Sequence, residues 1–237
     1  AAAARAHPPA ATAPEAEGTS YDNGYGRLTR SGDYEIGVHR DHVPPAPWTN
    51  VIANERAGFL VSERGGGFTW AANSFFYRLT PWYNDPVGDP TGEALYLRDE
   101  ESGETWSATP APVRRDAPYT VRHGAGWTRF AHEHAGIATR LTMAMAGDDP
   151  VKVSRLRVVN RGESPRRIAL TAYAEWTLGV LREHTQHQVR TEIDADRGAV
   201  FARNFFDPQF AAQVAFCAVS EPLAGPTGDR REFNGPN

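Results

Sequence analysis

The stretch RRIALTAYAEW, residues 166–176, alternates between two kinds of side chain along most of its length. The apolar set is Ile168, Leu170, Ala172, Ala174 and Trp176, and the intervening set is Ala169, Thr171, Tyr173 and Glu175. Successive side chains of a β-strand point to opposite faces of its sheet, so this period of two predicts a strand with one buried face.

The same period recurs in GIATRLTMAMAG, residues 136–147, with its apolar positions on one face. FAAQVAFCAV, residues 210–219, is apolar at both sets of positions, which favours a strand covered on both faces. Turn signals rich in Gly, Asn and Asp separate such segments, and only residues 177–187 suit a short helix. The sequence therefore predicts an all-β fold, a large antiparallel β-sandwich with at most one or two short helices.

Composition bounds the class of protein. The chain has 237 residues, 40% of them hydrophobic, and a formal net charge of -4 at pH 7. This is the composition of a globular domain, and its mild acidity argues against a nucleic-acid partner. Cys217 is the only cysteine, so no disulfide can form within the chain, which favours a reducing compartment. No apolar run approaches the about 20 residues that span a bilayer, so we expect no membrane contact by this segment.

Three parts are expected along the chain. Residues 1–19 are rich in Ala and Pro without periodicity, which predicts a flexible tail or linker. Residues 20–225 carry the strand patterns and form the sandwich domain. Residues 226–237 contain an Asp-Arg-Arg turn followed by Gly and Pro, which favours a connection to a further domain.

Two constellations could carry catalysis, and neither is specific. LRDEESGE, residues 97–104, gathers four acidic residues, whereas a glycosidase needs two carboxyl groups across a sugar, about 5–5.5 Å or about 6.5–9.5 Å apart. Consecutive acids at a hairpin tip usually face water, so we expect a solvated turn and assign no catalytic residue. His123, His132 and His134 could ligate a metal from neighbouring strands, but no further ligand is evident and no metal is predicted. A metal-dependent β-sandwich enzyme stays as one alternative.

The most informative cluster is aromatic and amide-rich. Flat aromatic rings contact the C–H faces of sugars, while amides, carboxylates and guanidinium groups bind their hydroxyls. The loop RLTPWYNDPVGDP, residues 78–90, is framed by prolines and is expected to be a rigid contact surface. The candidate residues, expected to face a carbohydrate or a partner domain, are Trp48, Asn50, Trp70, Asn73, Arg78, Trp82, Asn84 and Asp85. The alternative is that the Trp rings fill the core and the Asn side chains hold loops.

Long collinear segments resemble a known family. These include GFLVSERGGGFTWAANS (58–74), the run from Arg78 to Ser107, DDPVKVSRLRVVNRGESPRR (148–167) and TAYAEWTLG (171–179). Over about residues 20–237 the chain resembles the N-terminal β-supersandwich domain of glycoside hydrolase family 94, most of all the phosphorylase-like region of cyclic β-1,2-glucan synthases.

This resemblance implies a β-glucan-active glycosyltransferase or inverting glycoside phosphorylase as the whole protein. In that family the catalytic acid and the phosphate-binding groups lie on an (α/α)6 barrel, so no catalytic residue is carried over to this chain. Inorganic phosphate is expected only in the whole enzyme, and this segment alone is expected to be inactive. The implied partners are the (α/α)6 domain, β-glucan and a second copy in a homodimer. The implied location is the cytoplasm, including the cytoplasmic part of an inner-membrane protein. A self-sufficient, lectin-like carbohydrate-binding module is the other alternative.

Overall fold

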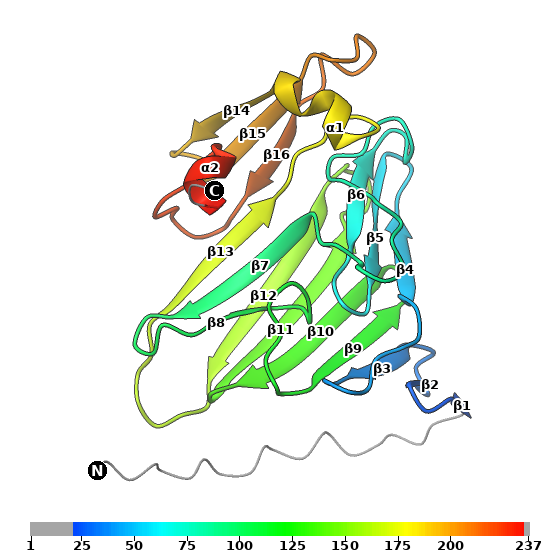
Figure 1. Ribbon diagram of the computed structural model, residues 1–237, viewed down its shortest axis with the longest axis vertical. Coiled ribbons are helices and arrows are strands. Elements are labelled where there is room, and N and C mark those ends of the chain that lie inside the picture. The colour runs from blue at the N-terminus through cyan, green and yellow to red at the C-terminus, as the bar shows by residue number, and fades with distance from the viewer. Residues whose placement is uncertain (1–20, 235–237) are drawn as a thin grey trace.

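The structure is a computed structural model and describes residues 21–234. It contains sixteen strands and two short α-helices, which confirms the predicted all-β sandwich (Figure 1). The predicted tail, residues 1–19, lies outside the described residues. Within residues 21–234, no helix has the length and apolar character needed to cross a bilayer.

One layer is a seven-stranded antiparallel sheet with the strand order β1-β2-β3-β9-β10-β11-β12. Its strands are β1 (Tyr21–Asp22), β2 (Gly26–Leu28), β3 (Tyr34–Val38), β9 (Tyr119–Gly124), β10 (Trp127–His134), β11 (Ile137–Met145) and β12 (Lys152–Asn160). β10, β11 and β12 are joined by short turns and pair along their full length. The predicted strand in residues 136–147 is therefore β11.

The second layer is built from two three-stranded sheets, β4-β5-β6 and β13-β7-β8. Their strands are β4 (Thr49–Ala53), β5 (Ala57–Ser62), β6 (Gly67–Ala71), β7 (Glu93–Asp99), β8 (Thr105–Ser107) and β13 (Ile168–Ala174). β6 is extended sideways by residues 77–80, since the Leu79 amide donates to the Thr69 carbonyl at 2.8 Å. Arg78 in turn exchanges backbone hydrogen bonds of 3.1 Å with Gly179.

The core lies between the two layers. Strand alternation turns one face of each sheet inward, and the buried apolar side chains of both layers form one cluster. Its largest fully buried members are Trp106, Tyr119, Phe59, Phe130, Ile36, Leu97, Ile137 and Leu141. The inward face is thus mostly apolar, and buried polar side chains such as Thr128 and Thr139 interrupt it.

A partly buried ion pair crosses between the layers. Lys152, the only lysine of the chain, reaches from β12 to Glu93 on β7, with Nζ 2.6 Å from Oε2. Its ammonium also lies 4.5 Å from the centre of the Phe59 ring. Burial alone would raise the pKa of Glu93, but Lys152 and the hydroxyls of Thr69 and Thr80 outweigh it and lower that pKa. The pair therefore stays ionised and ties β12 to the second layer.

A smaller sheet adjoins the second layer, with strand order β14-β15-β16. Its elements and the helices around it are β14 (Val189–Asp194), β15 (Ala199–Asn204), β16 (Ala215–Ala218), α1 (Arg182–Thr185), a 3-10 turn (Gln186–Gln188) and α2 (Arg230–Asn234). A second apolar cluster joins this sheet to the sandwich, and the ring of Tyr77 stacks on that of Phe210 at 4.5 Å.

Two sequence expectations are corrected here. Residues 210–219 do not form a strand covered on both faces, because only Ala215–Ala218 are strand and Phe216 is 48% exposed. The strand predicted in residues 166–176 exists as β13, but its apolar face is not fully covered, since Leu170 is 51% exposed. Both strands lie at the edges of their sheets, where packing on one side is missing.

Candidate functional site

The outer side of β6 carries an aromatic surface. Phe68 and Trp70 lie two positions apart, on the side of β6 opposite Thr69, which donates to Glu93 at 2.5 Å. Phe68 is itself buried, at 7% exposure, whereas Trp70 is half-buried. Trp70 lies flat against Gly58 on β5, where an added Cβ would come within 2.4 Å of its ring. Glycine at position 58 is therefore what lets this large ring lie on the sheet.

Residues from the following loop complete this surface. Trp82 stacks on Phe68 with ring centres 5.3 Å apart, and the Trp70 ring centre lies 5.2 Å from that of Phe68 in a tilted arrangement. The guanidinium of Arg78 lies 5.6 Å from the Phe68 ring centre and 5.2 Å from that of Phe75. We call Phe68, Trp70, Phe75, Arg78 and Trp82 the aromatic face.

Arg78 is fully engaged within the aromatic face. Besides the two rings, it donates to the carbonyls of Ser74 and Val180, both at 3.3 Å. Burial lowers the pKa of Arg78, yet an arginine keeps its charge at neutral pH. The resulting cation–π contacts hold the loop that follows Asn73 against the sheet. The aromatic face is thus ordered by its own contacts.

The loop of residues 78–90 is anchored at its far end by a buried carboxylate. Asp89 accepts a hydrogen bond of 2.5 Å from the Ser62 hydroxyl, and that hydroxyl accepts from the Gly66 amide at 3.0 Å. An added Cβ at Gly66 would lie 2.1 Å from the Asp89 carboxylate. Burial raises the pKa of Asp89. Within the triple glycine of residues 65–67, Gly66 is therefore the residue that lets the backbone approach this anchor closely.

The tip of the loop is exposed and shaped by local hydrogen bonds. Asn84 has a φ of +50°, in the left-handed region that Asn tolerates better than most residues. The Asp85 carboxylate accepts from the Val87 amide at 2.9 Å, and backbone hydrogen bonds from Gly88 and Val87 lower its pKa. Asn73 plays a similar part before Phe75, accepting from two backbone amides at 2.9 Å. The Asp85 and Asn73 side chains thus set local turns, and Asn84 contributes its left-handed backbone conformation.

Trp48 and Asn50 lie elsewhere. Trp48 immediately precedes β4, and Asn50 near the start of that strand pairs with Val61 near the end of β5. Trp70 instead pairs with Gly58, near the beginning of β5. Asn50 donates to the Gly124 and Trp127 carbonyls, both at 3.0 Å, and so fastens β4 to the β9–β10 turn. Trp48 packs against the core. Of the eight candidate residues, the structure brings together Trp70, Arg78 and Trp82, with Asn73 beside them.

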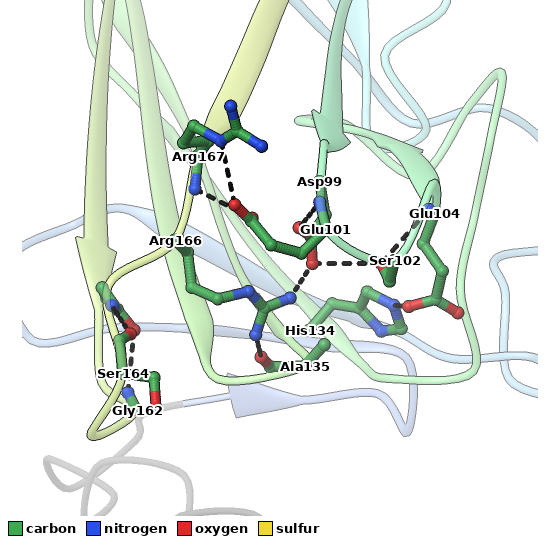
Figure 2. A network of polar contacts seen from close by, with 11 residues as sticks. Asp99, Glu101, Ser102, Glu104, His134, Ala135, Gly162, Ser164, Arg166 and Arg167 are labelled. Carbon is green, nitrogen blue, oxygen red and sulfur yellow. Dashed lines mark hydrogen bonds and ion pairs between the residues drawn. The ribbon is translucent and has the colours of Figure 1, made fainter.

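The acidic hairpin of residues 97–104 is a structural junction (Figure 2). Asp99 is 1% exposed and pairs with Arg166, whose guanidinium also donates to the Ala135 carbonyl at 3.4 Å. Glu101 accepts from the backbone amide of Arg167 at 3.0 Å. A solvated turn was the expectation, and for Asp99 it is wrong, because this carboxylate ties the β7–β8 turn to the β12–β13 and β10–β11 connections.

Each of the three candidate metal ligands, His123, His132 and His134, contacts a different protein group. His123 donates through Nε2 to the Trp48 carbonyl at 3.1 Å, and His132 donates through Nδ1 to the Pro118 carbonyl at 3.1 Å. His134 contacts Glu104 at 3.1 Å. Burial lowers the pKa of His132 to about 4, so its imidazole is neutral at pH 7. In the part of the chain that the structure describes, no three side chains converge as metal ligands, and the metal-enzyme alternative lacks support.

Phe68 and Phe75 are members of the aromatic face that sequence reasoning did not single out. Neither carries a polar group, so each is typical of a core residue when seen alone. The available signal was the position of Phe68 two residues before Trp70, which puts both rings on one side of a strand.

Comparison with known proteins gives one family and several relatives. The family model for the glycosyl hydrolase 94 supersandwich domain matches residues 32–237. The chain is 36% identical over 230 residues to a cyclic beta-(1,2)-glucan synthase, NdvB, of Rhizobium meliloti (strain 1021), covering 95% of this chain and 8% of that protein. It is 30% identical over 149 residues to an N,N'-diacetylchitobiose phosphorylase of Vibrio furnissii, covering 61% and 19% of the two chains. It is 28% identical over 225 residues to a solabiose phosphorylase of Paenibacillus borealis, covering 87% and 28%. The chain therefore spans less than a third of each relative.

Proposed function

This chain belongs to the glycosyl hydrolase 94 supersandwich domain family, and we propose that it is the non-catalytic β-domain of a β-glucan-active synthase or phosphorylase. The observation that carries this proposal is the 36% identity across 95% of the chain to a glucan synthase of which it spans 8%. A segment that is matched almost completely, yet forms so small a part of its relative, fits a supporting domain better than a catalytic one.

We further propose that the aromatic face contacts the catalytic domain, the glucan chain, or both. Its rings are fixed by stacking and by Arg78, and the loop of residues 78–90 is anchored through Asp89, so little conformational entropy is lost on binding. Phe75 of this face and its neighbour Phe76 are 54% and 53% exposed, which is unusual for adjacent large apolar residues on a free surface. Within the same proposal, the whole protein forms a homodimer and this domain lies in the cytoplasm.

The test uses the natural full-length protein and the 237-residue chain side by side. We expect the chain alone to turn over neither β-1,2-glucan with phosphate nor sugar phosphate with acceptor. In the full-length protein, Trp82→Ala is expected to lower kcat/KM about tenfold, as removal of one central aromatic contact does. Tyr21→Ala is the control, because Tyr21 is an exposed aromatic residue on β1, outside both the aromatic face and the loop of residues 78–90. Turnover by the isolated chain would refute the proposal.

A second candidate function is a lectin-like module, favoured by the presence of flat rings and a guanidinium on one ordered surface. Titration of the 237-residue chain with β-1,2-glucooligosaccharides, followed by Trp fluorescence, separates the two functions. A saturable change that Trp82→Ala abolishes favours the lectin. If Trp fluorescence does not change at millimolar sugar, the lectin function is refuted and the supporting role is retained.

A further inference from the structure

A second outward face, on the seven-stranded sheet, gathers arginines. Arg129 on β10, Arg140 on β11 and Arg155 and Arg157 on β12 all occupy positions that point away from the core. The register puts Arg129 opposite Thr142 and Thr142 opposite Arg155, and it puts Arg140 opposite Arg157. We call Arg129, Arg140, Thr142, Arg155 and Arg157 the arginine face.

These side chains surround a hollow of about 260 Å³, lined by the five residues of the arginine face. Arg129 is oriented by two contacts. Its Nε donates to the Thr142 hydroxyl at 3.2 Å, and its guanidinium lies 4.7 Å from the centre of the Trp127 ring. The hollow therefore has one wall that is already ordered and three guanidinium groups free to turn toward a ligand.

The positive charge of this hollow is not neutralised by any carboxylate within the described residues. Among residues 21–234, none of the four arginines forms an ion pair with a carboxylate. The nearby carboxylates are used elsewhere on this face, Glu35 by Arg27 and Arg122, and Glu133 by Arg161. Like charges directly opposite on paired strands, such as Arg140 and Arg157, are destabilising unless an anion lies between them.

We propose that the arginine face binds a phosphate group, either free or at the end of a small molecule. Guanidinium forks match the oxygens of phosphate in pairs, and a dianion suits four cations better than a single carboxylate does. The hollow has room for one phosphate and a few attached atoms. A nucleic acid is disfavoured, because the ion-paired Glu35 and Glu133 bound the patch and the whole chain has a net charge of -4. This departs from the expectation that phosphate concerns only the whole enzyme, and it does not depend on the proposed function.

The experiment is calorimetric titration of the 237-residue chain in phosphate-free, low-salt buffer. The probes are inorganic phosphate, glucose 1-phosphate and sodium chloride at matched ionic strength. We expect saturable binding of the phosphate probes and none of chloride. Tighter binding of glucose 1-phosphate identifies a phosphate ester as the ligand, and equal binding identifies the free anion. No saturable binding of either phosphate probe at millimolar concentration overturns the proposal.

Two double variants of equal charge change make the result specific. R140Q/R157Q removes a cross-strand pair from the hollow and is expected to weaken phosphate binding at least about tenfold, since charge-assisted hydrogen bonds are lost. R190Q/R203Q is the matched control, because Arg190 and Arg203 also face each other across paired strands, on β14 and β15. The control is expected to bind as the unmodified chain does. Equal weakening in both variants would show general attraction only and would overturn the proposal.

Circular dichroism checks that each variant folds. If R140Q/R157Q does not fold, Arg155→Gln and Arg155→Lys replace it. We then expect the glutamine variant to lose binding and the lysine variant, which keeps the charge but not the fork, to retain part of it. Binding that survives Arg155→Gln unchanged would overturn the proposal.

Discussion

The aromatic face on β6 and the arginine face on β10 to β12 both lie on the outside of the sandwich. In each, alternate residues of a strand are turned away from the core. Arg78 in the aromatic face contacts two rings and two carbonyl oxygens. Arg140 and Arg157 in the arginine face oppose each other across paired strands, and neither forms an ion pair with residues 21–234.

This difference separates two kinds of exposed surface. The aromatic face is satisfied by its own contacts, so it needs no ligand to be stable and suits a permanent neighbour such as a second domain. The arginine face presents donors and positive charge that no carboxylate among residues 21–234 pairs with, so an external anion is the partner that suits it. An ordered surface and an unsatisfied surface therefore indicate different kinds of partner, even when strand alternation has produced both.

The largest effect on stability is expected from loss of the ion pair between Lys152 on β12 and Glu93 on β7, which joins the two layers. Lys152→Met leaves Glu93 partly buried without its cation, and we expect the free energy of unfolding to fall by about 3–4 kcal/mol. Urea unfolding at pH 7 measures this. In the unmodified chain the folded-state pKa of Glu93 lies below its ordinary value. The ion pair therefore stabilises the folded state fully at pH values above the ordinary pKa, and this stabilisation is lost as the pH falls through the lowered pKa. The difference in free energy of unfolding between the unmodified chain and Lys152→Met should therefore become smaller at acidic pH.

The control for Lys152→Met is the double variant E93Q/K152M, which removes both charges and keeps an acceptor for the Thr69 hydroxyl. We expect it to recover much of the lost stability. If it is as unstable as Lys152→Met, the ammonium acts through its cation–π contact with Phe59 rather than through its pairing with Glu93.

A somewhat smaller effect is expected in the core beneath the arginine face. His132 has a pKa lowered by burial to about 4, against an ordinary value of about 6.5. The unfolded chain therefore binds a proton between these values and the folded chain does not, so stability is complete above about pH 6.5 and declines toward pH 4 by about 2–3 kcal/mol.

The variant His132→Phe keeps a ring stacked on Tyr119 and should flatten this part of the stability–pH profile. Thermal unfolding at a series of pH values is the measurement. His187→Gln, at an exposed histidine of the 3-10 turn, serves as the control. A profile that is unchanged in His132→Phe would mean that other groups cause the acid sensitivity.

Much of the fold could be predicted from the sequence. Less could be predicted of the aromatic face and the arginine face. The period of two around Leu141 identified β11, because alternation is a local property. Strand pairing is not local. Nothing near Trp48 indicates that it lies at the opposite end of β5 from Trp70, and the arginine face exists only once Arg129, Thr142 and Arg155 are aligned across three strands. The spacing of Arg155 and Arg157 by two was the one local sign of that face.

The sharpest test of the comparison is a pair of matched substitutions with opposite expected signs. Arg78→Gln removes contacts with two rings and two carbonyl oxygens, so we expect the free energy of unfolding to fall by about 1 kcal/mol. Arg140→Gln relieves repulsion with Arg157 and is expected to raise it by about 0.3 kcal/mol at low salt. Urea unfolding at low and high salt separates the two, because screening removes the second effect and spares most of the first. If both substitutions destabilise the chain alike, the arginine face is satisfied by contacts of its own, and the distinction between the two surfaces fails.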